Sequence, residues 1–275
     1  MILSRCLLLC LLYVAGGSVP AVWAGDLVLE GEAIQGGLMT GRTAPGTAIR
    51  VDDKAVRVGE DGLFVFGFGR DAPPRATVSA LFPDGGRAVR RLDVRQRDYR
   101  IQRIDGLPSR MVTPSADELA RIRAEGEKIA AARAGFSART GFAAGFIWPA
   151  QGRISGVYGS QRILNGEARQ PHLGIDIAAP AGTPVVAAAA GAVTLAEPDL
   201  YFTGGTVVID HGHGLSTVYS HLSAVGVAVG QEVARGQLIG RIGSTGRSTG
   251  AHLDWRINWF QERLDPMLIA GPPPQ

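Results

Sequence analysis

The chain has only two cysteines, Cys6 and Cys10, and both lie within its first ten residues. The sequence after that N-terminal stretch can therefore form no disulfide and offers no thiolate ligand. Any metal site there must use histidine, aspartate or glutamate. The formal net charge of +3 is too small to indicate a nucleic-acid-binding protein, so we expect no nucleic-acid partner.

The N-terminus has a short apolar run but no stop-transfer flank that would indicate a membrane span. Arg5 precedes the apolar run, and A-V-W-A supplies the small residues that signal peptidase favours before Gly25. We expect residues 1–24 to be a signal peptide. The remaining chain is then exported to the periplasm or cell envelope, without a stable membrane span after cleavage. A retained N-terminal anchor is the alternative, although Leu9 is large for lipidation of Cys10.

Residues 25–110 show short β-type runs separated by turn signals. The runs include L-V-L-E-G-E, T-A-I-R-V, K-A-V-R-V, L-F-V-F-G-F and A-T-V-S-A-L-F, with turns at G-E-D-G and P-D-G-G. This pattern predicts a small β-sandwich. The segment has no histidine and its acidic residues are scattered in turns, so we expect a structural or binding module.

Residues 111–144 are predicted to form a linker that contains one helix, because the apolar period changes at 114–134. Ser115 and Glu118 form a capping-box pattern at its start. Three apolar residues then fall on one helical face, with charged residues opposite: Leu119, Ile122 and Ile129. A linking helix is the preferred interpretation, and a partner-binding helix is the alternative.

From Phe146 onward the sequence is again rich in β-type runs and in glycine. No series of alternating helices appears, which argues against a parallel α/β sheet. The whole chain is thus predicted to be mostly β, with an antiparallel C-terminal domain at 145–269 and a tail at 270–275. All five histidines lie in this half: His172, His211, His213, His221 and His252.

Three short motifs in this half combine groups that bind metals. H-L-G-I-D has His172 and Asp176 four residues apart, on a loop that enters a strand. A-H-L-D has His252 and Asp254 two residues apart, so in a strand both leave by the same face. Between them, Y-S-H-L carries His221. Each motif alone is weak evidence for a metal site, because a single histidine in a strand usually has a structural role.

The remaining histidines, His211 and His213, lie in D-H-G-H-G. The glycines predict a turn, and we expect both histidines to be turn residues without a role in chemistry.

The ordered motifs H-L-G-I-D, Y-S-H-L and S-T-G-A-H-L-D-W resemble the LytM/lysostaphin-type zinc metallopeptidases. W-P-A-Q-G-R-I-S-G-V-Y-G and V-A-R-G-Q-L-I-G-R-I-G add to the resemblance, which covers about residues 146–268. It implies a compact antiparallel β-fold crossed by a groove. It also implies a zinc metalloendopeptidase that cuts stem or cross-bridge peptides of bacterial peptidoglycan.

The resemblance also implies roles for individual residues. His172 and Asp176 match the first two zinc ligands, and His221 and His252 match two histidines beside the metal that are not ligands. The family's third ligand is a histidine, whereas this chain has Asp254 at that position. Asp can also bind zinc, so we predict His172, Asp176 and Asp254 as ligands of Zn²⁺.

Asp254 leaves other functions open. Some relatives have lost ligands and activate cell-wall amidases or bind peptidoglycan, so a catalytically weak or inactive regulator is the alternative. Four of the five expected positions are intact, and this favours the enzyme. A secreted bacteriocin that attacks glycine bridges is a third interpretation, which the absence of a separate C-terminal targeting segment disfavours.

Overall fold

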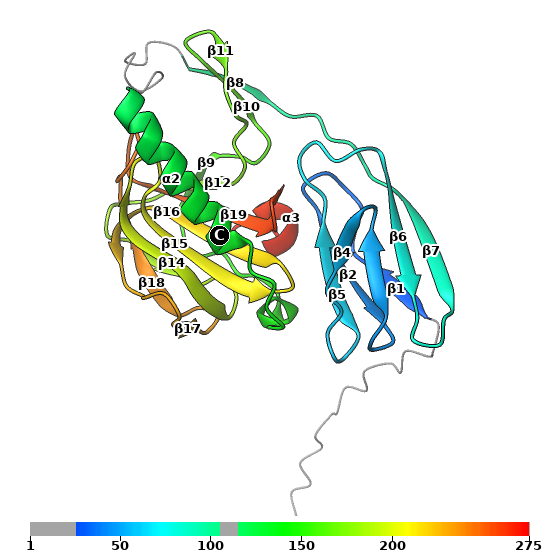
Figure 1. Ribbon diagram of the computed structural model, residues 1–275. Coiled ribbons are helices and arrows are strands. Elements are labelled where there is room, and N and C mark those ends of the chain that lie inside the picture. Colours follow the sequence, from blue (N-terminus) through cyan, green and yellow to red (C-terminus); the bar gives the residue numbers. More distant parts are fainter. Residues whose placement is uncertain (1–25, 105–114, 275) are drawn as a thin grey trace, which may run out of the picture.

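The computed structural model describes residues 26–104 and 115–274 of the chain (Figure 1). Strands account for 45% and helices for 11%, which confirms the mostly β fold. The predicted signal peptide lies outside the described residues, and so do residues 105–114, which include the end of the predicted module at 25–110 and the start of the predicted linker at 111–144. Within the described ranges, no helix is long and apolar enough to cross a membrane.

Two antiparallel sheets form the N-terminal half, with the strand orders β1-β2-β5 and β4-β3-β6-β7. The strands are β1 Leu27–Glu30, β2 Leu38–Thr43, β3 Ala48–Val51, β4 Lys54–Val56, β5 Leu63–Gly67, β6 Arg75–Leu81 and β7 Arg87–Asp93. Buried and exposed residues alternate along β3 and β6, so each presents one face to the core and the other to water. We call these seven strands the β-module.

The β-module packs directly against the C-terminal half of the chain. Every residue of β5 is buried, because one of its faces meets that half. A Cβ atom on Gly67 would lie only 2.6 Å from Leu264 Cδ2, so the missing side chain allows this close approach. Arg97 also forms an ion pair with Asp265 at 2.9 Å. The two halves thus share one continuous hydrophobic core.

A small third sheet joins the two halves through strands that are distant in sequence. Strand β8, Ile101–Ile104, pairs in parallel with β10, Gln161–Leu164, and β10 forms a hairpin with β11, Glu167–Ala168. The segment after β7 therefore supports the hairpin that precedes His172 (Figure 1).

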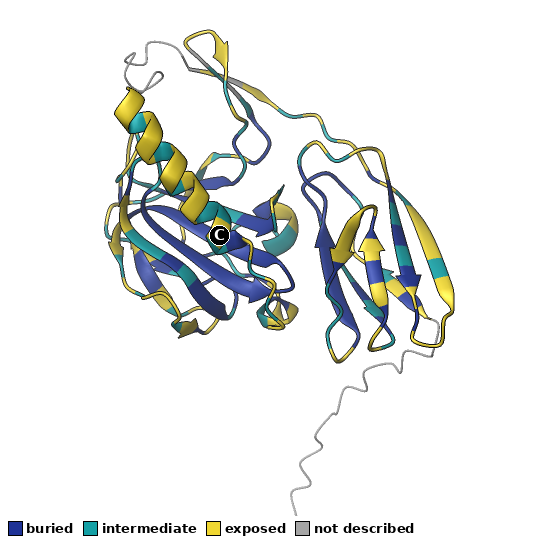
Figure 2. Cartoon of the chain, viewed as in Figure 1, coloured by how far each residue is buried: buried dark blue, intermediate teal, exposed yellow. Residues whose placement is uncertain are grey.

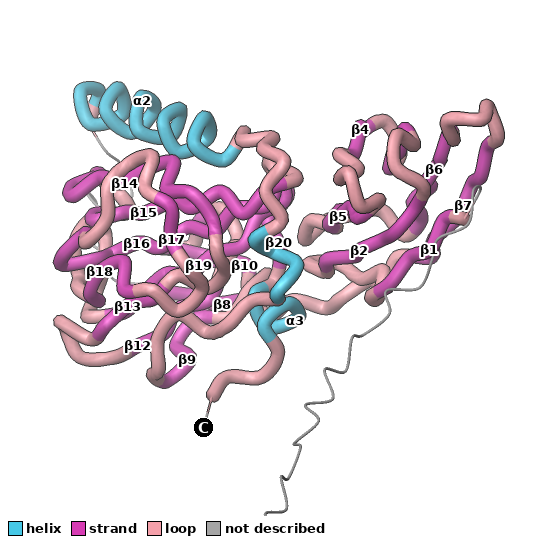
Figure 3. The backbone as a smooth tube through the Cα atoms, turned by 90° about the horizontal axis from the view of Figure 1, so that it is seen from below, coloured by secondary structure: helices cyan, strands magenta, loops and turns pink. Residues whose placement is uncertain are grey.

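The predicted linking helix is α2, Ala116–Arg133, and its predicted capping box is confirmed. Ser115 accepts a hydrogen bond from the Glu118 backbone N–H, and the Glu118 side chain accepts one from the Ser115 N–H. The helix lies beside β14 and β15 of the large sheet (Figure 3). Ile129 on its inner face packs against a small buried cluster: Leu195, Leu200, Val208 and Val218.

The C-terminal half is built on a ten-stranded sheet whose main path is β17-β14-β15-β16-β19-β12-β9. Its strands are β9 Arg153–Gly156, β12 Ile175–Ala178, β13 Pro184–Val186, β14 Gly191–Leu200, β15 Gly204–Gly212, β16 Leu215–Val225, β17 Glu232–Val233, β18 Leu238–Ile242, β19 His252–Trp259 and β20 Glu262–Leu264. A 3-10 turn, η1 Gly141–Ala144, precedes it and a short helix, α3 Pro266–Ala270, follows. The central strands β15 and β16 are almost wholly buried (Figure 2).

Candidate metal centre

Neighbouring strands of the large sheet bring two carboxylates side by side. Strand β12 pairs antiparallel with β19, and Asp176 lies directly opposite Asp254 in this register. Residues that face each other in this way project from the same side of the sheet. Both side chains are almost completely buried.

His172 joins the two carboxylates from the loop that leads into β12. Its backbone is fixed on both sides, because its N–H donates to Ser160 O at 2.9 Å and its C=O accepts from Gly159 N–H at 2.7 Å. One ligand atom from each of His172, Asp176 and Asp254 lies within 4.8 Å of the others. The structure therefore brings the three predicted metal ligands together.

A fourth charged side chain, that of Arg256, contacts this group. Its Nε lies 2.9 Å from Asp254 Oδ1 and its second guanidinium nitrogen lies 2.5 Å from Oδ2. Burial raises the pKa of the Asp254 carboxyl, but the charge and hydrogen bonds of Arg256 outweigh burial and hold the pKa below its usual range. Sequence reasoning missed Arg256, although its spacing of two from Asp254 on a strand puts both on one face.

The two remaining predicted site residues also meet here. The ring centroids of His221, on β16, and His252, on β19, are 4.6 Å apart. His252 Nε2 lies 3.9 Å from Asp176 Oδ1, so this pair borders the carboxylates. All five predicted site residues therefore belong to one cluster.

Hydrogen bonds indicate which ring nitrogen carries the proton in both imidazoles. His221 Nδ1 lies 2.8 Å from Thr245 O, and His252 Nδ1 lies 2.9 Å from Gly250 O. A carbonyl oxygen can only accept, so each Nδ1 carries a proton and each Nε2 is the nitrogen left for chemistry. Burial lowers the pKa of His221, which favours its neutral form.

Residues 170–266 match the model of peptidase family M23, and this range contains all five site residues. The chain contains a peptidase family M23 domain.

Relatives of this M23 domain support the assignment. The DD-carboxypeptidase/endopeptidase Mpg of Neisseria meningitidis is 44% identical over 104 residues, which are 38% of this chain and 24% of that protein. The peptidoglycan DD-endopeptidase ShyA of Vibrio cholerae is 43% identical over 106 residues, again 38% of this chain and 24% of that protein. The chain thus spans about a quarter of the length of these curated relatives.

A solved structure extends the likeness beyond the M23 domain. A protein of Pseudomonas aeruginosa assigned to peptidase M23 has a TM-score of 0.67 and 29% sequence identity. The match covers 87% of this chain and 96% of that one. It therefore includes the β-module as well as the M23 domain.

The residues of the M23 domain fit a metal ion. His172 is 3% exposed, and within the described residues its buried Nε2 has no hydrogen-bond partner. It lies 3.2 Å from Asp176 Oδ1 without hydrogen-bond geometry. Imidazole and carboxylate groups that converge in this way form a donor set that zinc accepts.

The other two histidines of the M23 domain lie outside this cluster. His213 is in the turn after β15, with a φ of 53°, and this confirms the predicted turn. The prediction was wrong for His211, which lies within β15 and is fully buried. Its Nδ1 lies 2.8 Å from Ala190 O and its Nε2 lies 2.7 Å from Thr217 Oγ1, so the strand continues through a segment whose glycines indicated a turn.

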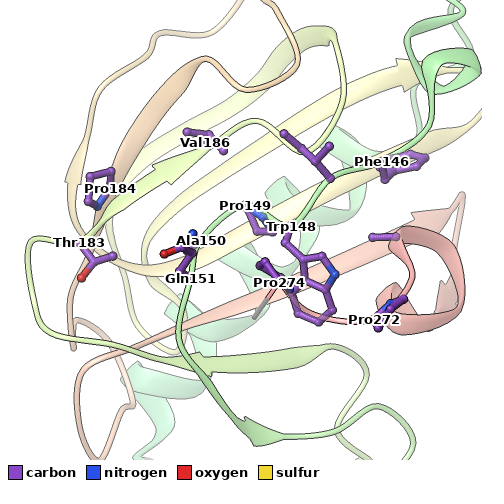
Figure 4. A pocket seen from close by; sticks show the side chains of 12 residues that line it. Phe146, Trp148, Pro149, Ala150, Gln151, Thr183, Pro184, Val186, Pro272 and Pro274 are labelled. Atoms are coloured by element: carbon purple, nitrogen blue, oxygen red, sulfur yellow. The ribbon is translucent and has the colours of Figure 1, made fainter.

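An apolar cavity of about 630 Å³ lies away from the candidate centre (Figure 4). Its lining includes Trp148, Pro184 and Pro272 but none of the five site residues. The Trp148 ring packs against Trp255 in a tilted arrangement, with centroids 5.4 Å apart and 60° between the ring planes. Because Trp255 follows Asp254 on β19, its side chain leaves by the opposite face, so the cavity and the carboxylates lie on different sides of the strand.

Proposed function

We propose that this chain is an exported zinc metalloendopeptidase that cleaves peptide bonds in bacterial peptidoglycan. The observation that carries the proposal is the convergence of His172, Asp176 and Asp254, whose ligand atoms lie within 4.8 Å of one another, next to the His221–His252 pair. A peptidase of this type needs metal ligands and proton-transfer groups together, and this cluster supplies both.

Each residue has a role in this proposal. His172, Asp176 and Asp254 would hold zinc, which supplies Lewis-acid chemistry by making a water acidic and polarising an amide carbonyl. His221 and His252 would move the proton from the attacking water to the leaving amine, because both rings keep Nε2 available. Once either ring has taken up that proton, its Nε2–H could donate a hydrogen bond to the oxyanion that develops on the amide oxygen.

The choice of peptidoglycan as substrate draws on the relatives. ShyA is named a peptidoglycan DD-endopeptidase and Mpg a DD-carboxypeptidase/endopeptidase. We extend that substrate class to this chain. We also propose export to the periplasm or cell envelope, because the N-terminal sequence has the features of a signal peptide.

We further propose that residues 145–269 form the catalytic domain and residues 25–110 a module that helps to bind intact cell wall. All candidate ligands belong to the first of these segments. The β-module contains no histidine or cysteine, which argues for a role in binding rather than in chemistry.

The test combines metal analysis with turnover. Purified protein should contain about one zinc per chain and should cleave cross-linked muropeptides, with both properties lost in His172→Ala. A zinc-free protein without turnover would refute the proposal. A control substitution of His211, which lies outside the cluster, should leave the zinc content unchanged.

One observation favours a second function. Asp254 is held by Arg256, and a carboxylate engaged in this ion pair could fail to bind metal. The chain would then be a regulator that binds peptidoglycan or activates a cell-wall amidase. Stimulation of an amidase without muropeptide cleavage by the protein itself would support this alternative.

A further inference from the structure

Asp254 and Arg256 form a closely matched ion pair at the edge of the candidate centre. Two guanidinium nitrogens of Arg256 contact the two carboxylate oxygens, at 2.9 and 2.5 Å. The Asp254 side chain is 6% exposed and that of Arg256 is 28% exposed. Within the described residues, the Arg256 side chain donates its hydrogen bonds only to Asp254.

The backbone leaves room for this pair between two of the candidate ligands. A Cβ atom on Gly174 would lie 2.6 Å from Arg256 Cγ and 2.9 Å from Asp254 Oδ1. Gly174 separates His172 from Asp176 in H-L-G-I-D. The ion pair therefore fits against the loop that carries the other ligands, and a larger residue there would displace it.

Arg256 also offsets the negative charge of two neighbouring carboxylates. Asp176 and Asp254 bring two nearly buried carboxylates within ligand distance of each other. Buried charges of the same sign are costly unless an opposite charge lies nearby. Arg256 supplies one positive charge at this point, next to Asp254.

We propose that Arg256 is a positioning residue of the metal centre, which fixes the Asp254 carboxylate and offsets its charge. The negative charge of Asp254 and the positive charge of Arg256 then cancel, so the pair resembles an uncharged ligand from the position of the ion. This inference rests on the metal site of the proposed function. It is compatible with metal binding, because a carboxylate has about four lone-pair sites and a bidentate arginine uses two of them.

Arg256 should affect both the zinc affinity and the stability of the metal-free protein. A divalent cation and the guanidinium repel each other, so Arg256 weakens metal binding while it stabilises the metal-free protein. In Arg256→Met, zinc should bind at least about tenfold more tightly, and the metal-free protein should unfold at a lower temperature. Arg256→Lys keeps the charge but not the bidentate contact, so its zinc affinity should stay closer to that of the wild type than the zinc affinity of Arg256→Met does.

The experiment measures zinc affinity by competition with a chelating indicator, and the unfolding temperature of the metal-free protein. Arg97→Met is the matched control, since Arg97 pairs with a buried aspartate, Asp265, at 2.9 Å. The side chains of Arg97 and Asp265 are 24% and 5% exposed, close to the values for Arg256 and Asp254. This control should lower the unfolding temperature and leave zinc affinity unchanged. Arg256→Gln is a second neutral variant if the methionine variant does not fold.

A double substitution tests whether Arg256 acts through Asp254. In an Asp254→His background the guanidinium has lost its carboxylate, so Arg256→Met should no longer lower the metal-free unfolding temperature and should raise it. An equal decrease in both backgrounds would mean that Arg256 only packs in the fold and would overturn the inference.

The outcomes separate this inference from the proposed function. Zinc bound by the wild type with unchanged or weaker affinity in both neutral Arg256 variants overturns the inference alone. Absence of zinc from the wild type overturns the proposed metal site itself.

Discussion

The rings of His221 and His252 lie 4.6 Å apart, and the backbone of β16 departs from regular strand geometry at His221. His221 has a φ of 65°, in the left-handed region that residues with a side chain rarely adopt. Its N–H donates to Thr203 O at 2.7 Å, which helps to hold this conformation. Strained backbone of this kind persists where the surroundings enforce it, and it concentrates at functional sites.

We predict that His221→Ala and His252→Ala each retain zinc and lose turnover by about 10²–10⁴-fold, as proton-transfer residues typically do. Metal analysis and muropeptide cleavage should be measured on the same preparations. Loss of zinc from His252→Ala, together with retention in Asp254→Ala, would mean that the roles of His252 and Asp254 are reversed.

The substitution Asp254→His should move the acid limb of the pH–rate profile to lower pH. It replaces a carboxylate with a neutral imidazole, so the centre becomes more positive and lowers the pKa of a zinc-bound water further. The profile of the wild type and of this variant should be compared at saturating zinc. Full zinc content and full activity in Asp254→Ala would contradict the assignment of Asp254 as a ligand.

Removal of residues 25–110 should leave a protein that still binds zinc, because every candidate ligand lies in the C-terminal half. The structure adds that this protein should be less stable, since β10 loses its partner β8 and Asp265 loses Arg97. Zinc stoichiometry and thermal unfolding of the truncated chain check both points. A folded but zinc-free product would show that the β-module is needed to form the centre.

Two glycine substitutions should have opposite effects on stability. Gly67→Ala brings a methyl group against buried Leu264 and should destabilise the protein by about 1–3 kcal/mol. Gly126→Ala lies in α2, where a Cβ meets no atom within 4 Å, and should stabilise it by about 1 kcal/mol. Urea unfolding of both variants measures the difference. A neutral Gly67→Ala would argue against the tight packing of β5 on the C-terminal half.

His211 should make folding stability sensitive to acid. Burial lowers its pKa from 6.5 to about 4, so between these values the unfolded chain binds more protons than the folded protein. Stability should therefore decrease as pH falls through this window, by on the order of 3 kcal/mol in total.

The variant His211→Gln isolates this effect. At pH 7 it should be less stable than the wild type, because it loses buried hydrogen bonds. The difference in folding stability between the variant and the wild type should become smaller at a pH of about 4.5, since only the wild type must keep a buried imidazole neutral. A difference that is independent of pH would contradict the prediction.

Signals from neighbouring residues in the sequence were sufficient to predict several features of the structure. The capping box of Ser115 and Glu118 predicts the start of α2, and short β-type runs between turn signals predict the strands of the β-module, because each signal depends on neighbours in sequence. The spacing of His252 and Asp254 likewise predicts that both leave one face of a strand. The ligand and catalytic roles themselves stay predictions.

Only the tertiary structure decided how distant segments meet. The parallel pairing of β8 with β10, the contact of Gly67 with Leu264 and the burial of His211 within β15 depend on residues far apart in the chain, for which periodicity carries no information. The same holds for the candidate centre. The resemblance of the sequence predicted that Asp254 stands at the position of the family's third ligand, a histidine, whereas the register of β12 on β19 puts Asp254 beside Asp176. The fold also places the Arg256 guanidinium against the Asp254 carboxylate.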